Sequence, residues 1–232
     1  MSATSLEKCP AYVLSQGDSM PGPRLSQIRP TVTISRETGA GARTVGQLLR
    51  DRLSTSSESK AENWTIYDQE IVKLMLEQHR LPPGIEHFLP EDGKPLLEDA
   101  LEDLLGLHPL VSELVLKTTA TILHLCRAGG AIIIGRGGNL IAAHVPGAIH
   151  VRLIAPIEAR IQRIVETRKL DEASAAEYVR KLDRARRQYV RRNYRAEVGD
   201  PHHYHMVLDT GRLGLSETAR LIASAVKAGN PS

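Results

Sequence analysis

The sequence predicts an α/β fold in which a parallel sheet is covered by helices on both faces. Short β-branched, apolar runs alternate along the chain with segments whose apolar residues recur at helical spacing. The most apolar run, 131–134, has no polar face, as expected of a central strand in such a sheet. Polar or glycine-rich turns follow several of the predicted strands. In parallel sheets, ligands bind at the edge formed by the C-terminal ends of the strands, where these turns lie.

The N-terminal part of the chain predicts a tail and then a phosphate-binding loop. Residues 1–29 are rich in Ser, Pro and Gly, and we expect a flexible tail before a domain at 30–228. Residues 31–35 read as a buried strand, Gly39 and Gly41 form a turn, and helical periodicity begins at Thr44. Strand, glycine turn and helix are the layout of a loop that cradles phosphate. The alternative is an ordinary strand–turn–helix connection.

The remaining elements follow from periodicity and from glycine and proline breaks. We expect further strands at 64–67, 131–134, 148–153 and 206–208. We expect further helices at about 69–79, 96–105, 111–127, 156–167, 171–194 and 216–227. The strands 31–35 and 131–134 should pair in parallel, because helical segments separate them along the chain.

Composition narrows the functional classes. The 232 residues carry a net charge of +3, but residues 81–126 hold eight acidic side chains, whereas residues 151–195 hold thirteen Lys or Arg. Aromatic residues make up only 3%, so few side chains are available to stack on nucleic-acid bases. Cys9 and Cys126 form no disulfide framework, and no apolar run is long enough to span a membrane. We therefore expect a cytoplasmic protein without a membrane or nucleic-acid partner.

Five motifs carry a resemblance to a known family. They are ISRETGAGARTVG at 34–46, YDQEIV at 67–72, IIIGRGGN at 132–139, DRARRQY at 183–189 and DPHHYHMVLDT at 200–210. In this order and spacing they resemble the cytidylate kinase-like family of P-loop nucleoside monophosphate kinases, over about residues 31–226. The resemblance implies a three-layer P-loop NTPase fold, ATP as phosphoryl donor, Mg²⁺ and a small nucleotide-like acceptor. It also implies a helical acceptor-binding insertion at about 69–127 and an arginine-rich lid at about 171–200.

The chain departs from the cytidylate kinase pattern in the loop and after the 131–134 run. That pattern resembles GPSGAGKGT in the loop, where this chain has Arg36 for the first Gly and Ala42 for the Lys. Gly137 stands where a cytidylate kinase carries Asp. We expect Arg43 to take over the phosphate contact of the absent lysine. The alternative is that Arg43 points to solvent or pairs with a carboxylate such as Glu37.

The resemblance assigns expected roles to the loop and to two residues beyond it. The residues expected to bind the ATP phosphates are Gly39, Ala40, Gly41, Ala42, Arg43 and Thr44, with the Thr44 hydroxyl also binding Mg²⁺. Asp68 and Arg136, each just after a predicted strand, are expected to bind the acceptor. For Asp68 the alternative is a helix N-cap, and for Arg136 a surface ion pair.

Three arginines of the predicted 171–194 helix, Arg184, Arg186 and Arg187, are expected to close over the ATP phosphates. The alternatives are a solvated charged helix and a helix that binds nucleic-acid phosphates. Asp209 is expected to be a turn or cap residue. His202, His203 and His205 are expected to be polar surface, because no further ligand stands at metal-binding spacing.

These observations predict an ATP-dependent phosphotransferase, cytidylate kinase-like, that acts on a nucleoside monophosphate or a similar small acceptor. The alternative is a nucleotide-binding regulatory module without turnover, because the Walker lysine is replaced. The 81–126 region, where the acceptor should bind, contains no arginine. The sequence therefore does not choose among acceptors, and it carries no signal for the oligomeric state.

Overall fold

A computed structural model describes residues 29–54, 64–68 and 108–229 of the chain. Its centre is a five-stranded sheet with the order β2-β3-β1-β4-β5, in which every neighbouring pair is parallel. The strands are β1 (Thr31–Arg36), β2 (Thr65–Tyr67), β3 (Ala131–Ile134), β4 (Ala148–Ile154) and β5 (Met206–Asp209). The predicted α/β fold is confirmed, and so is the parallel pairing of β1 with β3.

Seven α-helices and one 3-10 turn accompany the sheet in the described residues. They are α2 (Ala42–Ser54), α5 (His108–Ala128), α6 (Gly138–Ile141), α7 (Ile157–Arg168), α8 (Glu172–Tyr194), η4 (Pro201–His203), α9 (Thr210–Leu213) and α10 (Leu215–Lys227). Helix α2 begins two residues earlier than its apolar periodicity suggests. The helices expected at 69–79 and 96–105, most of the acceptor-binding insertion, Cys9 and nearly all of the expected tail lie outside the described residues.

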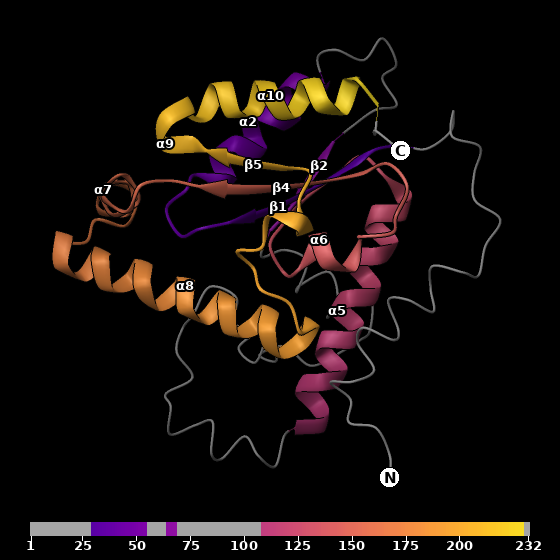
Figure 1. Cartoon of the computed structure of the whole chain (residues 1–232), viewed down its shortest axis with the longest axis horizontal. Coiled ribbons are helices and arrows are strands. Elements are labelled where there is room, and N and C mark those ends of the chain that lie inside the picture. Colours follow the sequence, from indigo (N-terminus) through magenta and orange to yellow (C-terminus); the bar gives the residue numbers. More distant parts are fainter. Residues whose placement is uncertain (1–28, 55–63, 69–107, 230–232) are drawn as a thin grey trace.

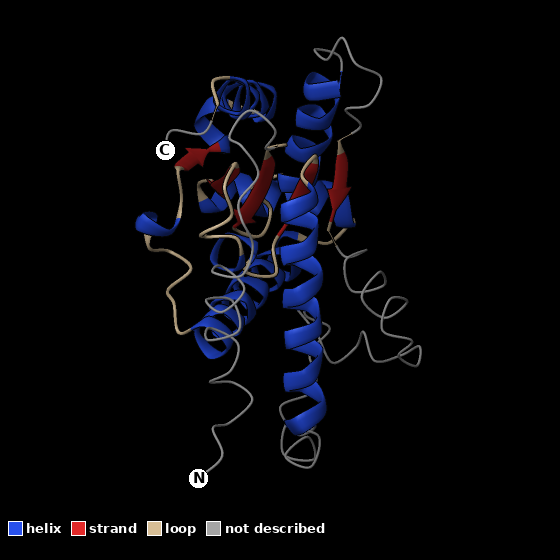
Figure 2. Cartoon of the chain, turned by 90° about the vertical axis from the view of Figure 1, so that its right-hand side faces the viewer, coloured by secondary structure: helices blue, strands red, loops and turns tan. Residues whose placement is uncertain are grey.

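The helices form a layer on each face of the sheet. Helices α2 and α10 pack over one face, where Val32 and Ile34 of β1 join a continuous apolar core with Leu49 and Ile222 (Figure 1). Helices α5 and α6 cover the other face, and Ile133 packs there with Ile122 and Ile141. In the view of Figure 2 the strands lie between these layers. Burial of both faces explains why β3 has no polar residue.

The face of β1 opposite its apolar residues is polar although it is buried. Thr31 donates to the carbonyl of Cys126 at 3.1 Å, and the Thr33 hydroxyl lies 2.8 Å from Nδ1 of His150. Ser35 accepts from Arg152 Nη1 at 3.0 Å. Because buried polar groups are costly without partners, these three hydrogen bonds specify how β1 sits against its neighbours.

Helix α8 is the long arginine-rich helix that the sequence predicts. Asp171 caps its N-terminus by accepting from the backbone N–H of Ser174 at 3.0 Å, as expected of an N-cap Asp. Its first half packs on α7 through Ala175 and Val179. Asp209 likewise caps α9, so its predicted cap role is confirmed. No helix in the described ranges is long and apolar enough to cross a membrane.

The buried His150 gives the fold a pH dependence. Burial, aided by the nearby His205, lowers the pKa of His150 from 6.5 to about 4, against a raising contribution from a backbone hydrogen bond at Ala142. The folded state thus favours the neutral ring, whereas the unfolded chain binds a proton near pH 6.5. The contribution to stability is complete above about pH 6.5 and is lost as the pH falls toward 4.

We expect the free energy of unfolding to fall by about 2 kcal/mol more in the wild type than in His150→Asn between about pH 7 and pH 5. Asn keeps a polar group near Thr33 but does not titrate. Urea unfolding at both pH values measures the difference. An equal fall in the free energy of unfolding of both proteins would show that His150 binds a proton as readily in the folded state as in the unfolded chain.

Candidate functional site

The loop of residues 37–41 joins β1 to α2 and is held in one conformation by its two glycines. Gly39 and Gly41 have φ of 81° and 80°, in the left-handed region. A Cβ on Gly39 would stand 2.5 Å from the carbonyl oxygen of Arg160, and one on Gly41 would stand 2.5 Å from the Leu215 side chain. No larger residue fits either position without a shift of the surrounding chain.

The carbonyl groups of this loop are bound by side chains from other elements. Arg163 of α7 donates to the carbonyl of Gly39. Thr210, at the start of α9, donates to the carbonyl of Ala40 at 2.9 Å. Because protein side chains bind these carbonyls, the carbonyls point away from the inside of the loop. The backbone N–H groups point to the opposite side, where they can bind a ligand.

Five backbone N–H groups gather at the end of the loop without an acceptor among the described residues. They belong to Gly39, Gly41, Ala42, Arg43 and Thr44. The N–H groups of Ala42, Arg43 and Thr44 belong to the first turn of α2, where no carbonyl of the helix is available to accept them. The dipole of α2 adds partial positive charge at the same place. The amide of Ala40 differs, because it closes a turn onto the carbonyl of Glu37 at 3.2 Å. This arrangement suits a phosphate group.

The side chains at the start of α2 divide between core and solvent. Ala42, at the position of the Walker lysine, is buried in the core with Val45. Thr44 is exposed, and its hydroxyl makes no hydrogen bond within the described part of the chain. Hard oxygen donors of this kind, together with phosphate oxygens, are what Mg²⁺ accepts. The described residues contain no cluster of three His, Cys, Asp or Glu side chains.

The carboxylate of Asp183 binds helix α8 to the 37–41 loop. Its Oδ1 accepts from the backbone N–H and from the hydroxyl of Thr38, both at 2.7 Å. Its Oδ2 accepts from Arg160 Nη1 at 2.6 Å, and Arg186 Nη1 donates to the Thr38 hydroxyl at 2.6 Å. The Asp183 carboxylate thus accepts hydrogen bonds from the loop, and the guanidinium groups of Arg160 and Arg186 lie next to it.

Arg43 pairs with Asp68. Its Nη2 donates to Asp68 Oδ2 at 3.1 Å, and its side chain is 62% exposed. Arg36 Nη2 lies 3.8 Å from the other oxygen of the same carboxylate. The partner of Arg43 is therefore a carboxylate, as in the alternative raised from the sequence, but it is Asp68 and not Glu37. Glu37 lies 3.4 Å from Arg160 instead.

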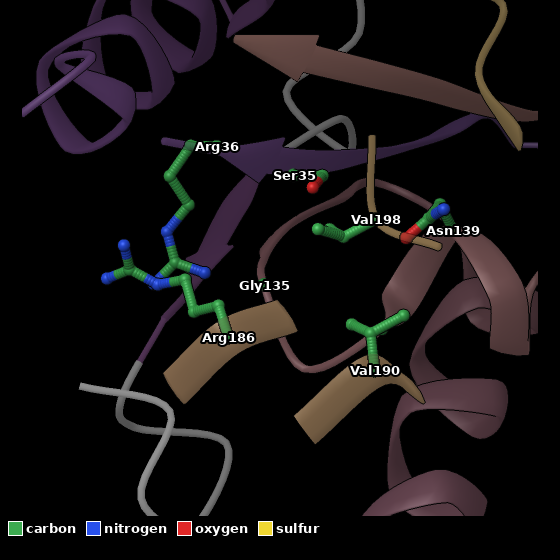
Figure 3. Close-up of a pocket in the computed structure, with 8 residues that line it drawn as sticks. Ser35, Arg36, Gly135, Asn139, Arg186, Val190 and Val198 are labelled. Atoms are coloured by element: carbon green, nitrogen blue, oxygen red, sulfur yellow. The ribbon is translucent and has the colours of Figure 1, made fainter. Parts of the chain in front are cut away.

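A cleft opens beside the loop, below the C-terminal ends of β1 and β3. Figure 3 shows the side chains of Arg36 and Arg186 among the residues that surround it. The residues that line it are Ser35, Arg36, Gly135, Gly137, Asn139, Arg186, Val190 and Val198. Arg136 is buried but does not line the cleft, although the glycines on both sides of it do. It holds a left-handed φ of 56°, which is uncommon for a side chain of this size.

The three lid arginines predicted as a group separate in the structure. Arg186 is buried and contacts the loop, whereas Arg184 and Arg187 are exposed on the other side of α8. The inward face of the helix contains Asp183, Arg186 and Val190, at spacings of three and four. The expected surface histidines also differ among themselves. His202 pairs with Asp200, whereas the ring of His205 stacks on buried His150 at 4.9 Å.

Sequence reasoning missed three residues of this site. Arg160 is buried within α7, where its spacing resembles that of an ordinary surface arginine. Arg152 lies in β4 and Arg36 ends β1, in strands that are buried on both faces. A charged residue in a strand that should be buried on both faces was the available signal, because such a residue needs a partner or a ligand.

Topology and loop geometry together define a P-loop kinase fold. The chain belongs to the cytidylate kinase-like family, whose profile matches residues 31–212. This confirms the family that the five motifs suggested. The family supports a kinase-like phosphotransferase that binds nucleotide.

Similar proteins have been solved or curated. An uncharacterized protein from Eubacterium ventriosum has a TM-score of 0.60 at 16% identity, covering 86% of this chain and 99% of its own. A shikimate kinase from Acinetobacter baumannii has a TM-score of 0.48 at 14% identity, covering 88% and 96%. A uronate isomerase from Corynebacterium glutamicum is 31% identical over 111 residues, which are 48% of this chain and 21% of that protein. The match thus spans about a fifth of that relative.

We expect Gly39→Ala to destabilise the protein by more than Gly229→Ala. Both glycines have φ near 80°, so alanine is strained at either position. Only Gly39 also faces a backbone atom at 2.5 Å, whereas nothing lies within 4 Å of a Cβ on Gly229. Thermal unfolding of the two variants separates crowding from backbone strain. Equal losses would mean that the loop moves away from Arg160 at little cost.

Proposed function

We propose that this protein transfers the γ-phosphoryl group of ATP to a small acceptor, a nucleoside monophosphate or a similar molecule. The observation that carries the proposal is the set of five open N–H groups at the 37–41 loop, beside the buried arginines Arg160 and Arg186. Phosphoryl transfer needs positioning and positive charge more than it needs a reactive side chain. This site supplies both.

The reaction follows from the placement of the loop and the cleft. An acceptor oxygen, which is a phosphate oxygen in a nucleoside monophosphate and a hydroxyl oxygen in an alcohol, attacks the γ-phosphorus; the bond from that phosphorus to the β–γ bridging oxygen breaks, and ADP leaves with the electron pair. With a hydroxyl acceptor, Asp68 would accept a hydrogen bond from the hydroxyl, whose proton passes to solvent. Mg²⁺ held at Thr44 would offset the charge of the phosphates.

The absent Walker lysine leaves open which cation contacts the β- and γ-phosphates. We propose that Arg186 provides the main contact, because it already donates to the loop at Thr38. Arg43 must first leave Asp68, to which it donates at 3.1 Å. It remains the second candidate, because its exposed side chain can turn toward the phosphates and its guanidinium can bind two oxygens.

A coupled assay of ADP release across nucleoside monophosphates, nucleosides and sugar acids tests the function. Sugar acids belong in the panel because the Corynebacterium relative is named for one. Acceptor-dependent ADP release supports the phosphotransferase. Tight ATP binding with no release for any acceptor would favour the regulatory module that lacks turnover.

We expect Arg186→Ala to weaken ATP affinity and turnover at least about tenfold, because one charge-assisted contact of about 1.5–3 kcal/mol is lost. Arg43→Ala should have a smaller effect, and the exposed Arg187→Ala should serve as the matched control on α8. Calorimetric titration with ATP and Mg²⁺ measures affinity. A larger loss of ATP affinity in Arg43→Ala than in Arg186→Ala would show that Arg43, and not Arg186, replaces the Walker lysine.

The lid at about 171–200 remains a prediction. An entering phosphate competes with the Asp183 carboxylate for Thr38 and gives Arg186 a new partner, so we expect α8 and the segment after it to become more protected. Hydrogen exchange with and without ATP and Mg²⁺ measures this. Unchanged protection across residues 171–200 would argue for a fixed helix.

We also propose a cytoplasmic location. ATP as donor supports it, and so does Cys126, which is a buried free thiol. Burial raises the pKa of this thiol to about 12, so it stays protonated and unreactive.

A further inference from the structure

The cleft beside the loop contains a buried amide oxygen that belongs to Asn139. This residue lies in α6, is 6% exposed and lines the cleft. Its Nδ2 donates to the carbonyl of His203 at 3.4 Å. Because a carbonyl can only accept, this contact fixes the orientation of the amide and leaves Oδ1 on the opposite side. In Figure 3 the oxygen of Asn139 lies on the side of Val198, another residue of the cleft wall.

This oxygen accepts no hydrogen bond among the residues that the structure describes. The protein does not enclose it completely, so it is accessible from the cleft. A side-chain acceptor at this depth loses free energy when no donor reaches it. Such acceptors are normally satisfied by an ordered water or by a ligand. Asn139 Oδ1 is therefore a position at which the cleft can bind a donor group.

The hydroxyl of Ser35 offers the cleft a second acceptor. Arg152 Nη1 donates to it at 3.0 Å. The Tyr204 hydroxyl lies 3.2 Å from it and donates to the carbonyl of Val198 at 2.8 Å. A phenol has one proton, so with that proton on Val198 the Ser35 hydroxyl donates its own proton to the Tyr204 oxygen. What Ser35 then presents to the cleft is a lone pair.

The surroundings of these two oxygens favour an uncharged donor. The guanidinium group of Arg152 lies behind Ser35 and pairs with no carboxylate in the described part of the chain, so an ammonium group would be repelled. An anionic group would meet two oxygen acceptors instead of donors. An N–H or O–H group without charge has neither disadvantage.

The position of Asn139 separates this donor from the reacting end of the ligand. Arg186 donates to Thr38 at the end of the cleft that meets the 37–41 loop, whereas Asn139 contacts His203 at the other end. A ligand that extends from one end to the other places its reacting oxygen at the loop and its donor group at Asn139.

We propose that Asn139 determines the specificity of the acceptor site, with its Oδ1 accepting a hydrogen bond from an uncharged N–H or O–H group of the acceptor. This inference rests on the proposed function and narrows its acceptor to molecules that carry such a group. The amino group of a nucleobase and a hydroxyl group of a sugar acid share this chemistry. An analogue that lacks the group would leave the buried oxygen without a donor and bind more weakly.

Two sets of probes remove one donor group at a time. CMP is compared with zebularine 5′-monophosphate, which lacks the amino group, and gluconate with its 2-deoxy and 3-deoxy derivatives. In calorimetric titration we expect CMP or gluconate to bind the wild type at least about tenfold more tightly than an analogue from its own set. Preference for CMP identifies a nucleobase, and preference for gluconate a sugar acid. Equal affinities within both sets, or no binding of any probe, would overturn the inference.

Variants of Asn139 separate donor recognition from support of the His203 segment. Asn139→Leu removes both contacts and should abolish the preference, whereas Asn139→Asp loses the bond to His203 but keeps an acceptor oxygen and should retain it. Asn193→Leu is the matched control, because Asn193 is also 6% exposed, donates to the Tyr189 carbonyl at 2.9 Å and does not line the cleft. The inference fails if the two Asn139 variants lose the preference equally, or if Asn139→Leu keeps it.

Should Asn139→Leu fail to fold, the comparison of probes on the wild type still decides. ATP titration of the wild type is read separately. Absence of ATP binding would remove the proposed function itself, whereas ATP binding without a preference within either set of probes removes only this inference.

Discussion

The carboxylate of Asp183 is the interaction on which the rest of the site depends. It accepts from the backbone and hydroxyl of Thr38 and from Arg160, so it joins the loop, α7 and α8 at one point. Without this anion, two buried guanidinium groups would lie close together with less compensation, at a cost of several kcal/mol. The same carboxylate holds α8 against the loop, so the position of α8 and the conformation of the loop depend on each other.

The loop divides its backbone groups between protein and ligand. Its carbonyls are bound by Arg163 and Thr210, which belong to elements far along the chain. Its amides are left open, and α2 adds the partial charge of its N-terminus. The protein thus builds an anion site mainly from backbone, and backbone amides do not depend on side-chain identity. This explains how the loop can retain its geometry although Ala42 replaces the Walker lysine.

The polar and charged side chains of the candidate site lie on one side of the sheet. One face of β1 is apolar and packs under α2 and α10, whereas the other face is polar and lies above α6 and α8. His150 stays neutral there because burial lowers the pKa of its ring to about 4. Arg36 and Arg186 line the cleft on this side, and Arg152 donates to the hydroxyl of Ser35, which also lines it. The candidate site therefore lies on the polar side of the sheet.

Local patterns in the sequence determined the elements and the family. Periodicity located the parallel strands and the long helix α8, Asp209 was readable as a cap, and the order of five motifs indicated the kinase-like family. Tertiary structure alone decided the partners. Arg43 meets Asp68, Arg186 turns inward while Arg184 and Arg187 turn outward, and Arg160 becomes the partner of Asp183. A sequence shows which residues carry charge, but which charges are buried together depends on packing between segments more than 20 residues apart, and no local spacing records that.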